Sequence, residues 1–151
     1  MTHEDFMRLA FEEASKCETD VPVGAILVRD GQVVAAAHNT RQDRGDPVGH
    51  AEINVLREAA RLLGTRRLED CTMYVTLEPC PMCAGAIALT RLKACYYGAP
   101  DAQMGCCGSV YHLPADPAFA CPTLIRGGLL ENEARERLQS FFRHRRGDTA
   151  P

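Results

Sequence analysis

The sequence has no tryptophan, and only 6% of its 151 residues are aromatic. It also lacks a long apolar run, since none approaches the roughly 20 residues that span a bilayer. This pattern argues against a membrane protein. The opening segment MTHEDFMRLAFEEASK mixes acidic and apolar residues, whereas a secretory signal has a basic start and an unbroken apolar stretch. We therefore expect a cytoplasmic protein.

Strong charge of either sign is also absent, because the formal net charge is −3. A protein that coats nucleic acid by bulk attraction is strongly basic, so the sequence disfavours this class. The balance leaves room for a local basic patch, and one occurs near the C-terminus at Arg143, Arg145 and Arg146.

Cysteine, by contrast, is frequent, with eight residues. Without a secretory signal, this number favours metal binding by thiolates over disulfides. Only Cys80 and Cys83 have the spacing of metal ligands. We expect the remaining cysteines to be packing residues, namely Cys17, Cys71, Cys95, Cys106, Cys107 and Cys121.

The chain has the length of one ordinary domain and shows no internal repeat, low-complexity tract or linker. We expect a single domain over residues 1–146, long enough to bury a core of its own. The short polar segment 147–151 is expected to be a disordered tail.

Hydrophobic periodicity predicts strands that alternate with helices. Apolar residues at helical spacing follow Thr2, a good N-cap residue, and predict a first helix. Segments 25–28 and 33–36 flank Asp30-Gly31, a dipeptide that favours a tight hairpin, and predict two antiparallel strands. Further strands are predicted over 72–77 and 94–97, and further helices after His50, after Cys80 and over 131–145, the last with Ala134, Leu138, Phe141 and Phe142 facing inward. Such alternation implies a three-layer α/β/α sandwich.

Three possible metal ligands fall at predicted helix starts. Cys80 and Cys83 lie one turn apart where Pro81 opens a helix, and a helix N-terminus lowers the pKa of a thiol. His50 begins the preceding helix and offers an imidazole. Structural zinc sites usually close with a fourth protein ligand, whereas catalytic sites leave the fourth position to water. Three ligands therefore indicate a catalytic zinc, with one zinc ion per chain.

Glu52 follows His50 by two residues, so its carboxylate can take a proton from water activated by the metal. It can then protonate a ring nitrogen and a departing amine. Alone, a CxxC pair is more often a structural zinc knuckle or a redox pair, and a lone histidine at a helix start is more often a surface cap. The combination of His50-Ala51-Glu52 with Pro79-Cys80-Pro81-Met82-Cys83, however, is the signature of the zinc-dependent nucleobase deaminases.

Beyond this signature, the chain resembles the bacterial tRNA-specific adenosine deaminases of the cytidine/deoxycytidylate deaminase superfamily. The likeness covers nearly the whole chain and is carried by Val21-Pro22-Val23-Gly24-Ala25, Asn39, Asp46-Pro47, His50-Ala51-Glu52-Ile53, residues 74–83, Ala84-Gly85-Ala86, Asp101, Gly105, Gly108-Ser109 and Phe141-Phe142-Arg143. The resemblance implies a cytidine-deaminase-like fold with a central mixed sheet. It also implies hydrolytic deamination of adenosine to inosine at the wobble position (34) of tRNA, by attack at C6.

The resemblance further implies roles for residues around the metal. Asn39 would hold the flipped base or its ribose, although it could be an ordinary loop asparagine. Pro22 and Val23 would form a pocket wall, or could simply start a buried strand. Asp101 would contact the sugar of the target strand, with a turn-forming aspartate as the alternative.

At the end of the last helix, Phe142 and Arg143 would stack on bases and bind phosphate. Alternatively, phenylalanines there could be core residues, and the cations could interact with the helix dipole. A tRNA anticodon stem-loop and a second copy of the chain, in a homodimer, are the implied partners. Two other functions remain open, namely a deaminase of a free base or nucleoside such as guanine or cytosine, and a non-catalytic zinc or RNA-binding module.

Overall fold

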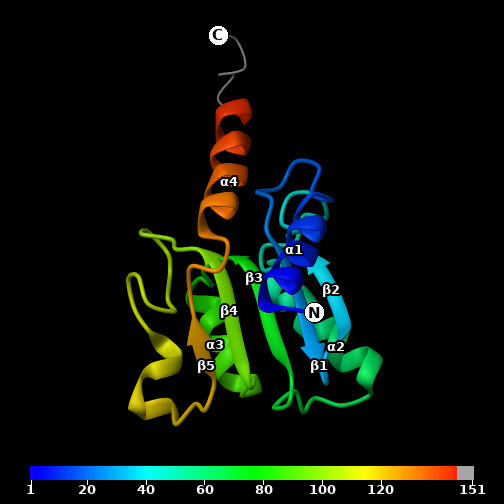
Figure 1. Cartoon of the computed structure of the whole chain (residues 1–151), viewed down its shortest axis with the longest axis vertical. Coiled ribbons are helices and arrows are strands. Elements are labelled where there is room, and N and C mark those ends of the chain that lie inside the picture. Colours follow the sequence, from blue (N-terminus) through cyan, green and yellow to red (C-terminus); the bar gives the residue numbers. More distant parts are fainter. Residues whose placement is uncertain (146–151) are drawn as a thin grey trace.

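The centre of the fold is a five-stranded mixed sheet with the strand order β2-β1-β3-β4-β5 (Figure 1). A computed structural model describes residues 1–145, so the predicted domain boundary at 146 and the tail 147–151 lie outside the described residues. The elements are α1 (His3–Ala14), β1 (Gly24–Arg29), β2 (Gln32–His38), α2 (Ala51–Leu63), β3 (Thr72–Leu77), α3 (Pro81–Thr90), β4 (Ala94–Ala99), the 3-10 helices η1 (Leu113–Ala115) and η2 (Pro117–Phe119), β5 (Leu124–Arg126) and α4 (Glu131–Arg145).

The first half of the sheet is antiparallel and the second half is parallel. β1 pairs with both β2 and β3 in antiparallel fashion, whereas β3, β4 and β5 run parallel. The hairpin between β1 and β2 turns at Asp30 and Gly31, which adopt φ angles of 51° and 74°. This confirms the predicted hairpin and its cause, because these residue types tolerate a positive φ.

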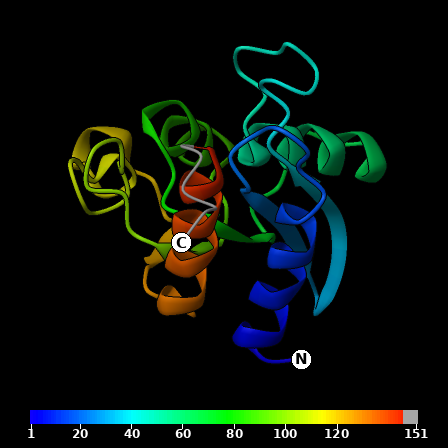
Figure 2. The same ribbon diagram turned by 90° about the horizontal axis from the view of Figure 1, so that it is seen from above.

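Helices cover both faces of the sheet, as Figure 2 shows from above. The helices α2 and α3 pack on one face, where Val55 and Ile87 join the larger hydrophobic core. On the opposite face, α1 and α4 pack over a second core that includes Phe11 and Ala134. The predicted three-layer α/β/α sandwich is therefore confirmed. None of the helices within residues 1–145 has both the length and the apolar character needed to cross a membrane.

Four of the six cysteines predicted to pack are buried in the larger core, namely Cys71, Cys95, Cys106 and Cys107. Cys17 and Cys121 are half-buried. The prediction that Phe142 faces inward is wrong, since 43% of its surface is exposed, while Phe141 beside it is half-buried. The last turns of α4 extend beyond the end of the sheet (Figure 1), and Leu138 is the last residue of this helix that packs against the second core.

Candidate metal centre and active site

Two helix N-termini meet beyond the C-terminal end of β3. His50 is the N-cap residue of α2, and Cys80 is the N-cap residue of α3, with Pro81 in the first turn. Neither side chain makes a capping hydrogen bond to its own helix. Both side chains are therefore free to bind a metal ion. Cys83, in the first turn of α3, lies close to both of them.

The distances among these three side chains fit a zinc ion. The Nδ1 atom of His50 lies 3.4 Å from Sγ of Cys80 and 3.5 Å from Sγ of Cys83, and all three ligand atoms lie within 4.8 Å of one another. A tetrahedral zinc ion with bonds of about 2.3 Å to sulfur and about 2.0 Å to nitrogen would hold such atoms about 3.5 Å apart. Among residues 1–145, this is the one such group of three or more possible ligands.

The protonation of the two sulfurs also suits a cation. A hydrogen bond with Cys83 lowers the pKa of the Cys80 thiol to about 4, and the hydrogen bond with His50 acts in the same direction. The contact with Cys80 raises the pKa of Cys83, so the two sulfurs share a proton. The hydrogen bond with Cys80 also raises the pKa of His50. A divalent cation would replace the protons held in this cluster, as metal binding to thiols and imidazoles does.

Glu52 lies beside the cluster, in the first turn of α2, and only 4% of its surface is exposed. Burial raises the pKa of its carboxyl group to about 7. A buried carboxyl group with a raised pKa, next to three metal-ligand candidates, is the arrangement expected of a group that accepts and donates protons.

A pocket of about 340 Å³ opens over these residues. His50, Glu52 and Cys80 line one part of it, while Val23, Asn39 and Asp101 contribute to the rest. The structure thus brings together three of the residues predicted to bind substrate with the predicted metal and catalytic residues.

The side chains of Asn39 and Asp101 also form hydrogen bonds with backbone groups of nearby residues. The Nδ2 atom of Asn39 donates to the carbonyl of Val21 at 3.2 Å, and its Oδ1 accepts from the amide of Arg41 at 3.1 Å. A carboxamide has two N–H groups and two lone pairs on oxygen, so it can contact a substrate in addition. Asp101 accepts from the amides of Gln103 and Met104, which makes it the turn-forming aspartate of the alternative interpretation, yet it also lines the pocket.

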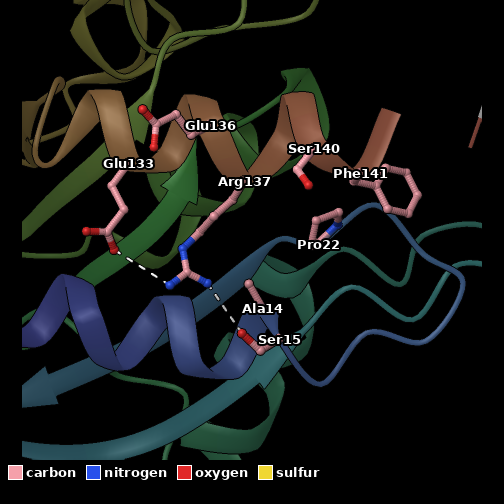
Figure 3. Close-up of a pocket in the computed structure, with 8 residues that line it drawn as sticks. All are labelled: Ala14, Ser15, Pro22, Glu133, Glu136, Arg137, Ser140 and Phe141. Carbon is pink, nitrogen blue, oxygen red and sulfur yellow. Dashed lines mark hydrogen bonds and ion pairs between the residues drawn. The ribbon is translucent and has the colours of Figure 1, made fainter. Parts of the chain in front are cut away.

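Three other predicted substrate residues lie outside this pocket. Pro22 lines a separate groove between α1 and α4, across from Ser140 and Phe141 (Figure 3). In that groove, Arg137 donates to Ser15 at 3.4 Å. Phe142 and Arg143 are exposed near the end of α4 and line neither the groove nor the pocket.

The pocket is also lined by residues that were not among the predicted site residues, namely Arg41, Leu77, Glu78 and Met104. The position of Glu78 was a usable signal, because it directly follows β3 and precedes the Pro79-Cys80 pair. Polar residues at the carboxyl ends of parallel strands commonly face a binding site.

The chain is similar to known proteins over the region that contains this site. Residues 1–99 match the family model of the cytidine and deoxycytidylate deaminase zinc-binding region. The chain belongs to this family. The tRNA-specific adenosine deaminase of Bacillus subtilis (strain 168) is 44% identical to this deaminase over 149 residues, which cover 97% of this chain and 92% of the relative. The protein of the same name from Agrobacterium fabrum is 42% identical, with 95% of each chain covered.

Solved structures agree with the fold of the deaminase. One, from a study of A-to-I editing by tRNA:A34 deaminases, is 41% identical with a TM-score of 0.84, covering 88% of this chain and 98% of its own. The guanine deaminase of Bacillus subtilis is 40% identical with a TM-score of 0.64, over 66% of each chain. Membership in a zinc-binding family agrees with the fit of the His50, Cys80 and Cys83 group to one zinc ion.

Proposed function

We propose that this deaminase hydrolyses adenosine to inosine at the wobble position (34) of tRNA. The observation that carries the proposal is its similarity, over nearly the full length, to a tRNA-specific adenosine deaminase. The pocket that contains His50, Glu52 and Cys80 supports the same chemistry. A non-catalytic module would have no use for a buried glutamate beside an open group of ligands.

In the proposed site, His50, Cys80 and Cys83 hold one zinc ion per chain. When bound, zinc supplies a Lewis acid that lowers the pKa of a coordinated water molecule. Glu52 is the catalytic residue, whose carboxylate takes a proton from the attacking water and passes it to the ring nitrogen of the base. It then takes the proton of the new hydroxyl group at C6 and passes it to the departing amine, which leaves as ammonia. Only 4% of the Glu52 surface is exposed, so its carboxyl group has little contact with bulk water.

Asn39 and Asp101 are proposed to contact the base and its ribose, because both line the pocket that also contains His50 and Cys80. Val23 forms part of the apolar wall beside the base. The volume of about 340 Å³ lies within the roughly 300–1,000 Å³ of typical small-ligand sites, so one flipped nucleotide is a suitable occupant.

The decisive assay offers the purified protein an anticodon stem-loop with adenosine at the wobble position, alongside free guanine, cytosine, adenine and cytidine. We expect inosine in the RNA and an equal amount of released ammonia. The free bases test the alternative function, since a guanine deaminase is similar to 66% of this chain. Turnover of a free base with no inosine in the stem-loop would replace the proposed substrate but leave the roles of His50, Glu52, Cys80 and Cys83 intact.

The exposed end of α4 is proposed to bind RNA beside the pocket. Phe142 is open for stacking, and Arg143 is an exposed cation on the same turn. Replacing both with alanine is expected to weaken stem-loop binding by roughly tenfold, since one stacked base contributes about 1–3 kcal/mol. Truncation after Ser140 should have at least this effect, and added salt should weaken wild-type binding, because phosphate contacts release counterions.

Fluorescence anisotropy with a labelled stem-loop measures this binding, and metal analysis checks that zinc is retained. Arg135→Ala is the matched control, because Arg135 lies on the same helix and forms an ion pair of 2.6 Å with Glu131. Equal affinities of the double variant and of this control would refute the RNA contact.

A homodimer is the proposed assembly, by analogy with the family and because twofold dimers are the commonest assemblies. Large apolar side chains on the α2 and α3 layer are exposed, including Leu89 at 86%. Light scattering is expected to give twice the chain mass of 16.6 kDa at micromolar concentration. Leu89→Glu should shift the mass toward the monomer, and an active wild-type monomer would contradict the prediction.

The proposed location is the cytoplasm, where tRNA is modified and where thiols stay reduced. Both Cys80 and Cys83 must be thiolates to bind zinc, and a reducing compartment keeps them available.

A further inference from the structure

Glu78 is a buried carboxylate that lines the pocket but is not one of the proposed metal ligands. It directly follows β3, and only 2% of its surface is exposed. Its Oε1 accepts from the amide of Asp101 at 3.0 Å and from the hydroxyl of Ser109. Its Oε2 accepts from the amide of Cys107 at 3.1 Å and from the amide of Ser109 at 3.0 Å. Both oxygens of this carboxylate are therefore used to hold a single segment, residues 101–109.

The segment also packs directly on the carboxylate. A Cβ atom on Gly105 would lie 2.3 Å from Cδ of Glu78 and 2.5 Å from the carbonyl oxygen of Asp101, so only glycine fits without a shift of the chain. Next to it, the amide of Cys106 donates to the carbonyl of Pro79 at 2.9 Å. The backbone that leads into Cys80 is thus joined to the segment at two successive residues, Glu78 and Pro79.

Residues 101–109 carry part of the pocket wall. Asp101 and Met104 line the same pocket as His50 and Cys80. The Oδ1 atom of Asp101 accepts from the amide of Met104 at 3.1 Å, so the two residues form one turn. The position of this turn relative to Cys80 depends on the contacts of Glu78 and Pro79, because the turn itself lies in a loop after β4.

We propose that Glu78 is a positioning residue that fixes the segment 101–109 as the substrate-selecting wall of the pocket. A buried carboxylate is costly unless hydrogen bonds satisfy it, and here all four donors come from the wall. Ordering of the wall is thereby achieved before substrate binds, which reduces the entropy lost on binding. The inference rests on the proposed function only for the choice of the stem-loop as the substrate probe.

Glu78→Gln tests the role, because the shape is kept while one acceptor oxygen becomes an NH₂ group. At least one backbone amide among Asp101, Cys107 and Ser109 then loses its acceptor. We expect the hydrogen exchange of residues 101–109 to accelerate by roughly tenfold or more. We also expect the KM for the stem-loop to rise by roughly tenfold with a smaller change in kcat, while the zinc content stays the same.

Two further variants keep the test decisive if Glu78→Gln folds poorly. Ser109→Ala removes the hydroxyl donor and keeps the carboxylate, so it should give the same pattern with a smaller amplitude. The control is Asp116→Asn, because Asp116 accepts from the amide of Ala118 at 2.8 Å in a loop that does not line the pocket. For this control we expect the same rate of hydrogen exchange in residues 101–109 and the same KM as in the wild-type protein.

The proposal is overturned if Glu78→Gln and Ser109→Ala both show wild-type exchange in residues 101–109. It is also overturned if they change kcat alone, because a wall that selects substrate acts on KM. Failure of the proposed function has a different signature, namely no inosine from the wild-type protein. In that event the exchange measurement, which needs no substrate, still decides the role of Glu78.

Discussion

Glu52→Gln is expected to lower the rate of inosine formation by roughly 10²- to 10⁴-fold, the typical contribution of a general acid–base group. The amide has nearly the shape of the carboxyl group but cannot carry a proton between water and the base. Because Glu52 is not among the three ligand candidates, the zinc content should remain at one ion per chain. Single-turnover assays with the stem-loop measure the rate, and metal analysis measures the zinc.

The matched control for this variant is Glu58→Gln on the same helix. Glu58 lies on the outer face of α2 and pairs with Arg61 at 2.6 Å. An exposed ion pair contributes little, so this variant should keep the wild-type rate. A Glu52→Gln enzyme with activity within about tenfold of wild type would contradict the role of Glu52 as the proton carrier.

Cys83→Ala is expected to abolish zinc retention after washing with a chelator and, with it, nearly all deamination. Cys83 is fully buried, and its removal leaves only His50 and Cys80 at the site. Two ligands are too few for a stable catalytic zinc site, which uses three protein ligands. The melting temperature should fall as well, because a ligand that binds only the folded state stabilises it.

Cys71→Ala is the control for the loss of a buried sulfur. Cys71 is equally buried in the larger core but is outside the ligand group. It should keep one zinc ion per chain and most of the activity, although the small cavity should lower the stability slightly. Full zinc occupancy in Cys83→Ala would show that the ligand assignment is wrong.

The elements with strong local signals could be predicted from the sequence. The Asp30-Gly31 turn and Pro81 at the start of α3 both occur where the structure uses them. The convergence of His50, Cys80 and Cys83 could be predicted too, because each falls at a helix start. Their roles as zinc ligands, and that of Glu52, stay predictions.

Features that depend on distant contacts could not be predicted. The strand β5 has only three residues and is recognisable only by its pairing with β4. The contacts of Glu78 join residues 23 to 31 positions apart, which no local pattern reveals. Phe142 has the apolar spacing of its helix, and this periodicity predicts that its side chain is buried. The helix α4 continues past the end of the sheet, however, and the Phe142 side chain is exposed.

The proposed chemistry and the proposed selection of substrate come from different parts of the chain. The ligand group lies at the starts of α2 and α3, whereas Asp101 and Met104 belong to a loop attached through Glu78 and Pro79. Replacing residues 101–109 with another sequence that keeps Gly105 and Ser109 would therefore change the pocket wall and leave the reaction centre unchanged. In this architecture, a lineage could acquire a new substrate by altering a short loop, with no intermediate that loses its metal.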